Sequence, residues 1–294
     1  MPHILTLVAP PGALTPSLLS LVRAALGADG GTPDWLSEGE AVDIPFTNLA
    51  AEPAMAAARA ALGLAPVDAI AQPLATRRKK LLLADMDSTI VTTETLDELA
   101  AEAGLKAQIA AITARAMNGE LDFKAALRER VAMLKGLPEA ALERTWATTE
   151  LMPGARTLVA TMRAAGAYAA LVSGGFNFFT GRVAALVGFD EHHSNTLEIA
   201  AGKLLGTVAD PILDRDSKLA QLKRLATAKG LGLAETLTVG DGANDLPMLL
   251  AAGLGVAFHA KPLVQAQARA RVNHGDLTAL LFAQGFHRAE FLAA

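Results

Sequence analysis

Three apolar runs of strand length end abruptly in clusters of small and acidic residues, and this recurrence restricts the folds that the chain can adopt. The clusters are DMDST at 85–89, SGG at 173–175 and GDGAND at 240–245. A continuous apolar run of this length is typical of a strand buried on both faces, as in a parallel sheet covered by helices. Because parallel strands open on one edge at their carboxyl ends, the sequence predicts that the three clusters meet in one crevice.

Beyond Pro153 the pattern alternates between helix and short apolar strand. Such alternation predicts right-handed crossovers, and therefore an α/β fold with a doubly wound, Rossmann-like parallel sheet. Gly230 follows an amphipathic segment and is the expected stop of one helix. We expect strands within 167–175, 235–242 and 253–258, and helices near 154–164, 176–187, 217–229 and 244–251.

Two further regions flank the first of these strands. Residues 93–148 are helical in pattern and predict a helical cap inserted after that strand. Residues 1–76 are rich in Pro, Gly and Ala, with weak periodicity, and predict a small accessory domain, regulatory or dimerising, ahead of a catalytic domain at 77–294. The basic segment ATRRKK at 75–80 lies between the two, and we expect a solvated linker there.

Composition excludes several classes of function. The 26 basic and 30 acidic side chains leave a net charge of -4, and aromatic residues make up 4% of the chain, so it offers neither the basic field nor the stacking surface that nucleic acids need. Cysteine is absent, which excludes thiolate catalysis and cysteine-bound metals. Apolar segments fall short of the roughly 20 residues that span a bilayer, and the N-terminal segment lacks the basic leader of a signal peptide. We therefore expect a cytoplasmic protein without nucleic-acid or membrane partners.

Four aspartates in these clusters define the expected chemistry. Carboxylates gathered in one crevice repel one another unless protonation or a hard cation relieves the repulsion. Oxygen ligands without cysteine favour Mg²⁺ over zinc. With a lysine and a serine hydroxyl beside the cation, the crevice suits a phosphoryl group, whose spread charge needs electrostatic support. The four carboxylates are those of Asp85, Asp87, Asp241 and Asp245, and the lysine is Lys218.

The spacing of the first two aspartates suits a stepwise transfer of the phosphoryl group. A carboxylate can attack phosphorus and form an aspartyl-phosphate, which divides hydrolysis into two easier steps. A second acid two residues on can protonate the leaving alcohol and afterwards deprotonate water. Asp85 and Asp87 have this spacing.

DMDST, SGG, Lys218 and GDGAND resemble, in order and spacing, the four motifs of the haloacid dehalogenase superfamily of phosphatases, over about residues 80–275. The resemblance implies that Asp85 is the nucleophile and that Asp87 is the general acid and base. It also implies two sets of ligands. The phosphate would be held by Ser173, Gly174, Lys218 and Asn244. Mg²⁺ would be held by Asp85, Asp241 and the main-chain carbonyl of Asp87, and Asn244 and Asp245 would orient these ligands.

Two segments are similar to a narrower family, the phosphoserine phosphatases: AMNGELDFKAALRERVAMLKGL at 116–137 and SGGFNFF at 173–179. That family hydrolyses O-phospho-L-serine to L-serine and phosphate through an aspartyl-phosphate, in the last step of serine biosynthesis. The resemblance implies that Glu94 binds the substrate ammonium and that Arg130 binds its carboxylate through a bidentate fork. The apolar cap residues that help to exclude water would be Met117 and Phe123.

The sequence alone leaves other functions open. The same chemistry can serve another small phosphate monoester, or it can transfer the phosphoryl group to a second alcohol. A catalytically silent amino-acid sensor is a third alternative, although the concentration of carboxylates argues against it. His192 and His193 are adjacent, so we expect them on the surface rather than around a metal ion. The expected partner is a small-molecule substrate, and a homodimer is left open.

Overall fold

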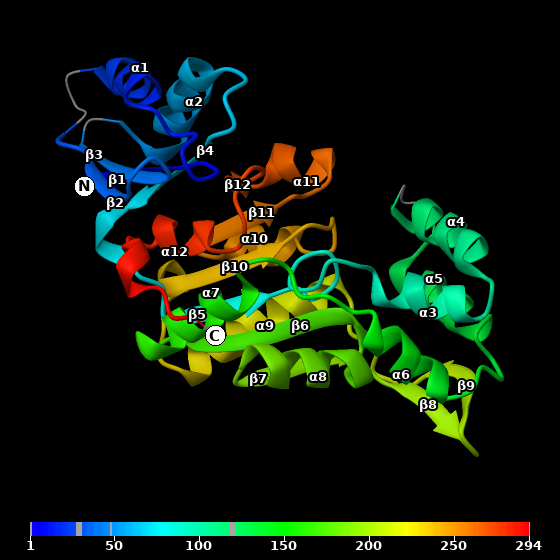
Figure 1. Ribbon diagram of the computed structural model, residues 1–294. Coiled ribbons are helices and arrows are strands. Elements are labelled where there is room, and N and C mark those ends of the chain that lie inside the picture. Colours follow the sequence, from blue (N-terminus) through cyan, green and yellow to red (C-terminus); the bar gives the residue numbers. More distant parts are fainter. Residues whose placement is uncertain (1, 28–30, 48, 118–120, 294) are drawn as a thin grey trace.

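A computed structural model describes residues 2–27, 31–47, 49–117 and 121–293. The described elements form three parts, which are an N-terminal sheet with two helices, a central parallel sheet with helices on both faces, and a group of helices beyond the ends of the central strands (Figure 1). No helix within these ranges is long and apolar enough to cross a membrane.

The N-terminal part is a four-stranded antiparallel sheet of order β2-β3-β1-β4. Leu5 and Leu7 of β1 pack with Val22 of α1 on the face that carries both helices. Val8 and Ile70 belong instead to the core of the central sheet, so both faces of this small sheet are covered. Burial on both faces removes the polar alternation that marks a strand, which explains the weak periodicity of this region. The elements are β1 (His3–Val8), α1 (Pro16–Leu26), β2 (Asp34–Ser37), β3 (Ala41–Phe46), α2 (Ala51–Leu62) and β4 (Asp68–Pro73).

The central sheet has six parallel strands in the order β12-β11-β10-β5-β6-β7. The chain moves outward from β5 to β7, crosses back, and then moves outward in the other direction from β10 to β12. The winding therefore reverses between β5 and β10, and ligands of doubly wound sheets bind where this reversal occurs. The strands are β5 (Leu81–Ala84), β6 (Tyr168–Phe176), β7 (Glu191–Asn195), β10 (Thr236–Gly240), β11 (Leu254–Phe258) and β12 (Ala270–Val272).

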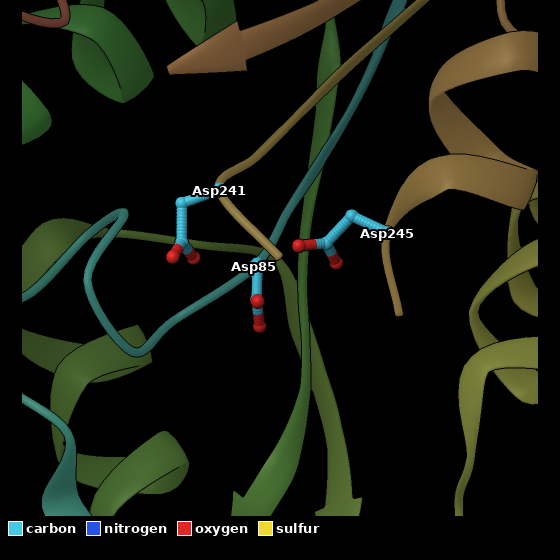
Figure 2. A group of neighbouring side chains, drawn as sticks. All are labelled: Asp85, Asp241 and Asp245. Carbon is cyan, nitrogen blue, oxygen red and sulfur yellow. The ribbon is translucent and has the colours of Figure 1, made fainter. Parts of the chain in front are cut away.

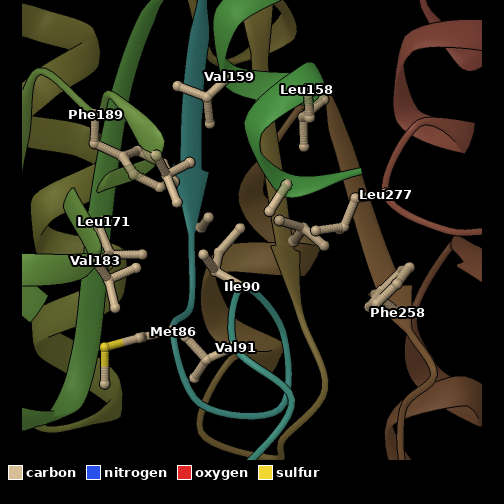
Figure 3. Close-up of a cluster of buried hydrophobic side chains, with 14 of the residues drawn as sticks. Met86, Ile90, Val91, Leu158, Val159, Leu171, Val183, Phe189, Phe258 and Leu277 are labelled. Carbon is tan, nitrogen blue, oxygen red and sulfur yellow. The ribbon is translucent and has the colours of Figure 1, made fainter. Parts of the chain in front are cut away.

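Helices bury both faces of this sheet, which confirms the predicted fold class. Leu81 and Leu83 of β5 pack with Leu222 of α9 on one face. Leu82 belongs to the larger cluster on the other face, with Val159 of α7, part of which is drawn in Figure 3. The uninterrupted apolar run before Asp85 is therefore a strand buried on both sides. The covering helices are α7 (Ala155–Ala164), α8 (Asn177–Val187) and α12 (Ala279–Ala283), and on the second face α9 (Arg215–Ala228) and α10 (Leu246–Ala251).

Four of the described helices that lie between β5 and β6 in the chain stand beyond the ends of the strands, at the right of Figure 1. A hairpin that the sequence analysis did not predict, β8 (Leu197–Ala200) with β9 (Lys203–Val208), packs against α5. Its turn has positive φ at Ala201 (48°) and Gly202 (70°), the geometry of a tight two-residue hairpin loop. The four helices are α3 (Thr95–Glu102), α4 (Lys106–Met117), α5 (Phe123–Ala132) and α6 (Ala140–Ala147).

The segment between the two sheets differs from the solvated linker expected there. Arg77 forms a 2.5 Å ion pair with Asp43 of β3, and both side chains are mostly buried. Lys79 is 5% exposed, and its Nζ donates to two main-chain carbonyls, at 2.7 and 2.9 Å. The prediction was therefore wrong for these two residues, whereas Arg78 and Lys80 are exposed. A helix that the sequence analysis also missed, α11 (Pro262–Gln267), precedes β12.

Candidate active site

Asp85 and Asp241 follow directly after β5 and β10, the two strands between which the winding reverses. The pairing of these strands continues into the site, because the main-chain N–H of Asp85 donates to the carbonyl of Val239 at 3.0 Å. Asp245 comes from the turn after β10. All three side chains are buried, with oxygens within 4.8 Å of one another, and they converge in Figure 2. The predicted meeting of the acidic clusters is confirmed for these three residues.

The glycines of GDGAND leave room for the turn to fold back on itself. A Cβ atom at Gly240 would lie 2.4 Å from Cγ of Asp245, and one at Gly242 would lie 2.2 Å from Oδ1 of Asn244. The main-chain N–H of Gly242 also donates to Oδ2 of Asp245 at 3.0 Å. The small residues therefore let the turn hold Asp245 against the strand end and keep half-buried Asn244 beside it.

Lys218 lies in the middle of the carboxylates. It belongs to the first turns of α9, whose start is fixed by the N-cap Asp214. Its Nζ lies 2.8 Å from Oδ1 of Asp85 and 2.6 Å from Oδ1 of Asp245. Burial alone would lower the pKa of Lys218, but the two carboxylates hold that pKa above its ordinary value. The two carboxylates therefore favour the charged form of Lys218.

One ammonium does not balance three buried carboxylates. Burial, followed by the charge of Asp245, raises the pKa of Asp85 well above its ordinary value. The same two causes raise the pKa of Asp241 to about 7. A donor set made of carboxylate oxygens that resist ionisation in the absence of another cation fits a hard divalent cation. Both oxygens of Asp245 already accept hydrogen bonds, Oδ1 from Lys218 and Oδ2 from Gly242. Asp85 and Asp241 are therefore the side chains best placed to hold such a cation.

The carboxyl group of Asp87 is held apart from this cluster. Its Oδ1 accepts from the main-chain N–H of Thr95 at 2.8 Å, and its Oδ2 accepts from Oγ of Ser173 at 3.1 Å. Burial, and next the charge of Glu94, raise the pKa of Asp87 to about 6. The two aspartates of DMDST therefore lie in different environments. The metal role predicted for Asp87 concerns its main-chain carbonyl and stays a prediction.

Residues 173–175 lie at the carboxyl end of β6, where the pairing with β7 shifts register. This bulged segment, the SGG loop, faces both the acids and the cap. Ser173 is fully buried, and its Oγ accepts from the main-chain N–H of Gly175 at 2.8 Å while donating to Asp87. A Cβ atom at Gly174 would lie 3.1 Å from Cζ of Phe123, at the start of α5. The cap thus places an aromatic ring directly over this loop. Met117 is the last residue of α4, and its side chain lies outside the described residues.

Glu94 and Arg130 approach the same site from the cap. Oγ of Ser88 donates to Oε1 of Glu94 at 2.8 Å. Arg130, on α5, donates from Nη1 to Oγ1 of Thr113 at 3.1 Å. Burial lowers the pKa of Arg130, and the charges of Asp97, Glu94 and Asp87, in that order, oppose this decrease. An acid and an arginine on the cap therefore lie within electrostatic reach of the Asp87 carboxyl.

Several residues that shape the site were not predicted. Thr95 contributes through its main-chain N–H, and Oγ1 of Thr89 donates to Asp241 at 3.4 Å. A main-chain contact leaves no signature in side-chain type, so sequence inspection had no signal for Thr95. His192 and His193 lie on the edge strand β7, and their partners are Thr180 of α8 and Glu191 respectively, away from the carboxylates.

Comparison with known proteins agrees with this geometry. Residues 82–250 match the family model of haloacid dehalogenase-like hydrolases. Phosphoserine phosphatase from Streptomyces coelicolor is 42% identical over 257 residues, which are 86% of this chain and 62% of that protein. Phosphoserine phosphatase from Streptococcus thermophilus is 47% identical over 199 residues, 68% of this chain and 93% of that protein. The chain thus spans less than two thirds of the Streptomyces relative.

A solved structure extends the similarity over both sheets. The haloacid dehalogenase family hydrolase t0658 from Salmonella enterica superposes with a TM-score of 0.86 at 31% identity. The match covers 97% of this chain and 98% of that one, so it includes the N-terminal sheet as well as the central sheet and cap. From the family match and these relatives, the chain belongs to the haloacid dehalogenase-like hydrolases.

Proposed function

We propose that the protein is a phosphoserine phosphatase, which hydrolyses O-phospho-L-serine to L-serine and phosphate, the last step of serine biosynthesis. One observation carries the proposal: two carboxyls two residues apart lie in different environments under one cap. Asp85 is paired with Lys218, whereas Asp87 is bonded to Ser173 and faces the charge of Glu94. Environments that separate the pKa values of two acids are the usual basis for giving them different catalytic roles.

Asp85 is positioned to attack phosphorus. Its Oδ1 accepts from the main-chain N–H of Met86 at 2.8 Å and lies 2.8 Å from Nζ of Lys218. Both of these donors, the N–H of Met86 and the ammonium of Lys218, reach Oδ1. Among the described residues Oδ2 has no such donor, so Oδ2 is the oxygen that attacks. Attack forms the bond from Oδ2 to phosphorus and breaks the ester bond to the serine oxygen, giving an aspartyl-phosphate.

Asp87 supplies and removes the proton that each step needs. In its protonated form it donates to the departing serine oxygen, and the carboxylate that remains then takes a proton from the water that attacks the aspartyl-phosphate. The products are phosphate, free Asp85 and a reprotonated Asp87. A pKa of about 6 suits a group that must hold the proton in one step and release it in the next.

The metal ion of the proposed reaction is Mg²⁺, held by Asp85, Asp241 and the main-chain carbonyl of Asp87. The all-oxygen, buried donor set supports this choice. When bound, Mg²⁺ neutralises charge on the phosphoryl oxygens and on the carboxylates around them. Lys218, Ser173 and Asn244, with the backbone at Gly174, bind the remaining phosphate oxygens, and Asp245 keeps Lys218 in place.

The cap supplies the proposed selectivity for phosphoserine. Glu94 binds the substrate ammonium, and Arg130 binds its carboxylate. Phe123, which lies over Gly174, helps to close the site against water. The substrate is thus a small zwitterionic phosphate monoester, held by opposite charges at its two ends.

The proposed function also assigns a role to each of two domains. Residues 77–294 form the catalytic domain with a cap at about 93–148, and residues 1–76 form an accessory domain. The burial of Arg77 against Asp43 supports a fixed, rather than flexible, attachment of the two. We place the enzyme in the cytoplasm, where its substrate is a metabolite.

Release of inorganic phosphate tests the proposal. The wild type and Asp85→Asn are incubated with O-phospho-L-serine and other phosphate monoesters, with Mg²⁺ or with EDTA. We expect release that is fastest on phosphoserine, absent with EDTA and absent in the variant. Release that favours a different ester would overturn the substrate, and release that is equal with EDTA would overturn the metal.

A further inference from the structure

Asn195, the last residue of β7, lies where two loops of the candidate site meet. We propose that Asn195 is a positioning residue, which fixes the loop of Ser173 relative to the start of α9 so that Ser173 and Lys218 form one phosphate site. The inference rests on the proposed function, because it concerns the phosphate that these two residues bind. Asn195 itself is not placed against the substrate.

The side chain of Asn195 is 2% exposed and joins the two loops through three hydrogen bonds. Its Nδ2 donates to the carbonyl of Gly174 at 2.8 Å and to the carbonyl of Leu213 at 3.3 Å. Its Oδ1 accepts from the main-chain N–H of Leu213 at 2.7 Å. The amide thus bonds both main-chain groups of Leu213, as a neighbouring strand would, and uses its second donor on the SGG loop.

The hydrogen bond to Gly174 replaces a strand-to-strand bond that is missing at the end of β6. Pairing between β6 and β7 shifts register between Val172 and Phe176, and Phe176 pairs with Asn195 after the shift. The residues in between leave the ladder to bring Oγ of Ser173 to Asp87. The carbonyl of half-buried Gly174 has no ladder partner in this bulge, and a carbonyl that is partly shielded from water and lacks a donor is unfavourable. Nδ2 of Asn195 supplies that donor.

The two bonds to Leu213 act at the other side of the site. Leu213 immediately precedes Asp214, whose side chain caps α9 by accepting from the main-chain N–H groups of Asp216 and Ser217. Lys218 follows in the next turn and reaches Asp85 at 2.8 Å. Because a helix moves as a rigid element, a displacement at Leu213 displaces the ammonium of Lys218. Catalytic groups tolerate displacements of less than about 1 Å.

A second buried amide, at the amino-terminal end of the strands and away from the candidate site, provides a matched control. Gln284 is 1% exposed, and its Oε1 accepts from the main-chain N–H of Lys79 at 3.1 Å, just before β5 begins. Its Nε2 donates to the carbonyl of Leu280 at 3.0 Å. Asn195→Asp and Gln284→Glu make the same chemical change, from amide to carboxyl, at the two ends of the strands.

The test measures binding of inorganic phosphate by calorimetry in the presence of Mg²⁺, with kcat, KM and the melting temperature of each variant. Asn195→Asp keeps the acceptor for Leu213 but loses both donations, and Asn195→Ser removes the long amide without adding charge. We expect the Kd of phosphate and the KM to rise at least tenfold in both. Gln284→Glu should lower the melting temperature while leaving the phosphate Kd within twofold of wild type.

The outcomes distinguish a failure of the positioning role of Asn195 from a failure of the proposed phosphatase function. A phosphate Kd that is unchanged in either folded Asn195 variant would overturn the positioning role, whatever the loss in melting temperature. An equal rise of Kd in Gln284→Glu would also overturn it, because the effect would then follow general destabilisation. A wild type that binds no phosphate would overturn the proposed function. If the wild type binds phosphate but does not hydrolyse phosphoserine, the proposed substrate is wrong. The comparison of phosphate Kd values between the variants would still decide the role of Asn195.

Discussion

The ammonium of Lys218 lies 2.8 Å from Oδ1 of Asp85, and the two side chains are only 1% and 7% exposed. A pair buried to this degree depends on both partners, because the removal of one leaves the other charge uncompensated in a medium that solvates it poorly. The pair also selects which oxygen of Asp85 is held and which is available for reaction. In the proposed reaction, stability and catalysis therefore depend on the same contact.

Lys218→Met should damage both properties. The loss of the ammonium leaves Asp85 and Asp245 without their cation, so the free energy of unfolding should fall by about 3–5 kcal/mol. Loss of charge at the phosphate should lower kcat by about 10²–10³. Denaturant unfolding and steady-state kinetics measure the two effects. Lys80→Met, at an exposed pair with Glu235, is the control and should leave the free energy of unfolding and kcat close to the wild-type values. Activity retained in Lys218→Met would refute the phosphate-binding role.

Glu94→Gln should move the pH dependence of the reaction. Burial and the charge of Glu94 raise the pKa of Asp87 to about 6, so removal of that charge should lower the pKa of Asp87. Because the first step needs protonated Asp87, the decline of kcat/KM on the alkaline side should begin at lower pH than in the wild type. Glu98→Gln, on the same helix but paired with Lys106, is the control. A shift in the opposite direction would exclude Asp87 as the acid.

Arg130→Lys should separate substrates that carry a carboxylate from those that do not. Lysine keeps the charge but loses the bidentate fork, so kcat/KM for O-phospho-L-serine should fall about 10- to 100-fold. O-Phosphoethanolamine has the ammonium without the carboxylate, and its kcat/KM should change less than about threefold. Arg128→Lys, on the same helix at an exposed pair with Asp210, should affect neither substrate. Equal losses on both substrates would show that Arg130 supports the fold of the cap instead.

Lys79 should give stability an alkaline dependence. Burial lowers the pKa of Lys79 from 10.5 to about 8, so between these values the unfolded chain binds more protons than the folded chain. The contribution of Lys79 to the free energy of unfolding should therefore rise with pH across this window, by about 3 kcal/mol in total. Denaturant unfolding of the wild type and Lys79→Met from pH 7 to 10.5 measures it. Parallel curves for the two proteins would contradict the perturbed pKa.

The candidate site could be predicted largely because its parts share one structural cause. Asp85 and Asp241 each follow a strand of one parallel sheet, and Ser173 lies near the carboxyl end of a third, β6. The order of the strands and the residue types at their ends therefore suffice to bring the three residues together. Burial of the strands on both faces is likewise indicated by apolar runs such as Leu81–Ala84. Such features depend on local sequence and on the general geometry of parallel sheets.

Features that depend on packing between distant segments could not be predicted. The N-terminal sheet is covered on both faces, so its strands lack alternation, and Arg77 is buried only because Asp43 lies opposite it across 34 residues of chain. The hairpin β8–β9 turns at Ala201 and Gly202, which are not the Asn-Gly pair that usually marks such a loop. Asn195 has no motif of its own, and its bonds to Gly174 and Leu213 become visible only when the folded chain brings these residues to either side of it.

The central claim, that Asp85 becomes phosphorylated during turnover, can be tested by trapping. The wild type is mixed with O-phospho-L-serine and Mg²⁺, quenched within a turnover and reduced with borohydride, which converts an aspartyl-phosphate to homoserine, and the peptides are analysed by mass spectrometry. We predict homoserine at position 85 in the wild type and none at position 87. Steady phosphate release with no modification at position 85, or with modification at another carboxylate, would contradict the account.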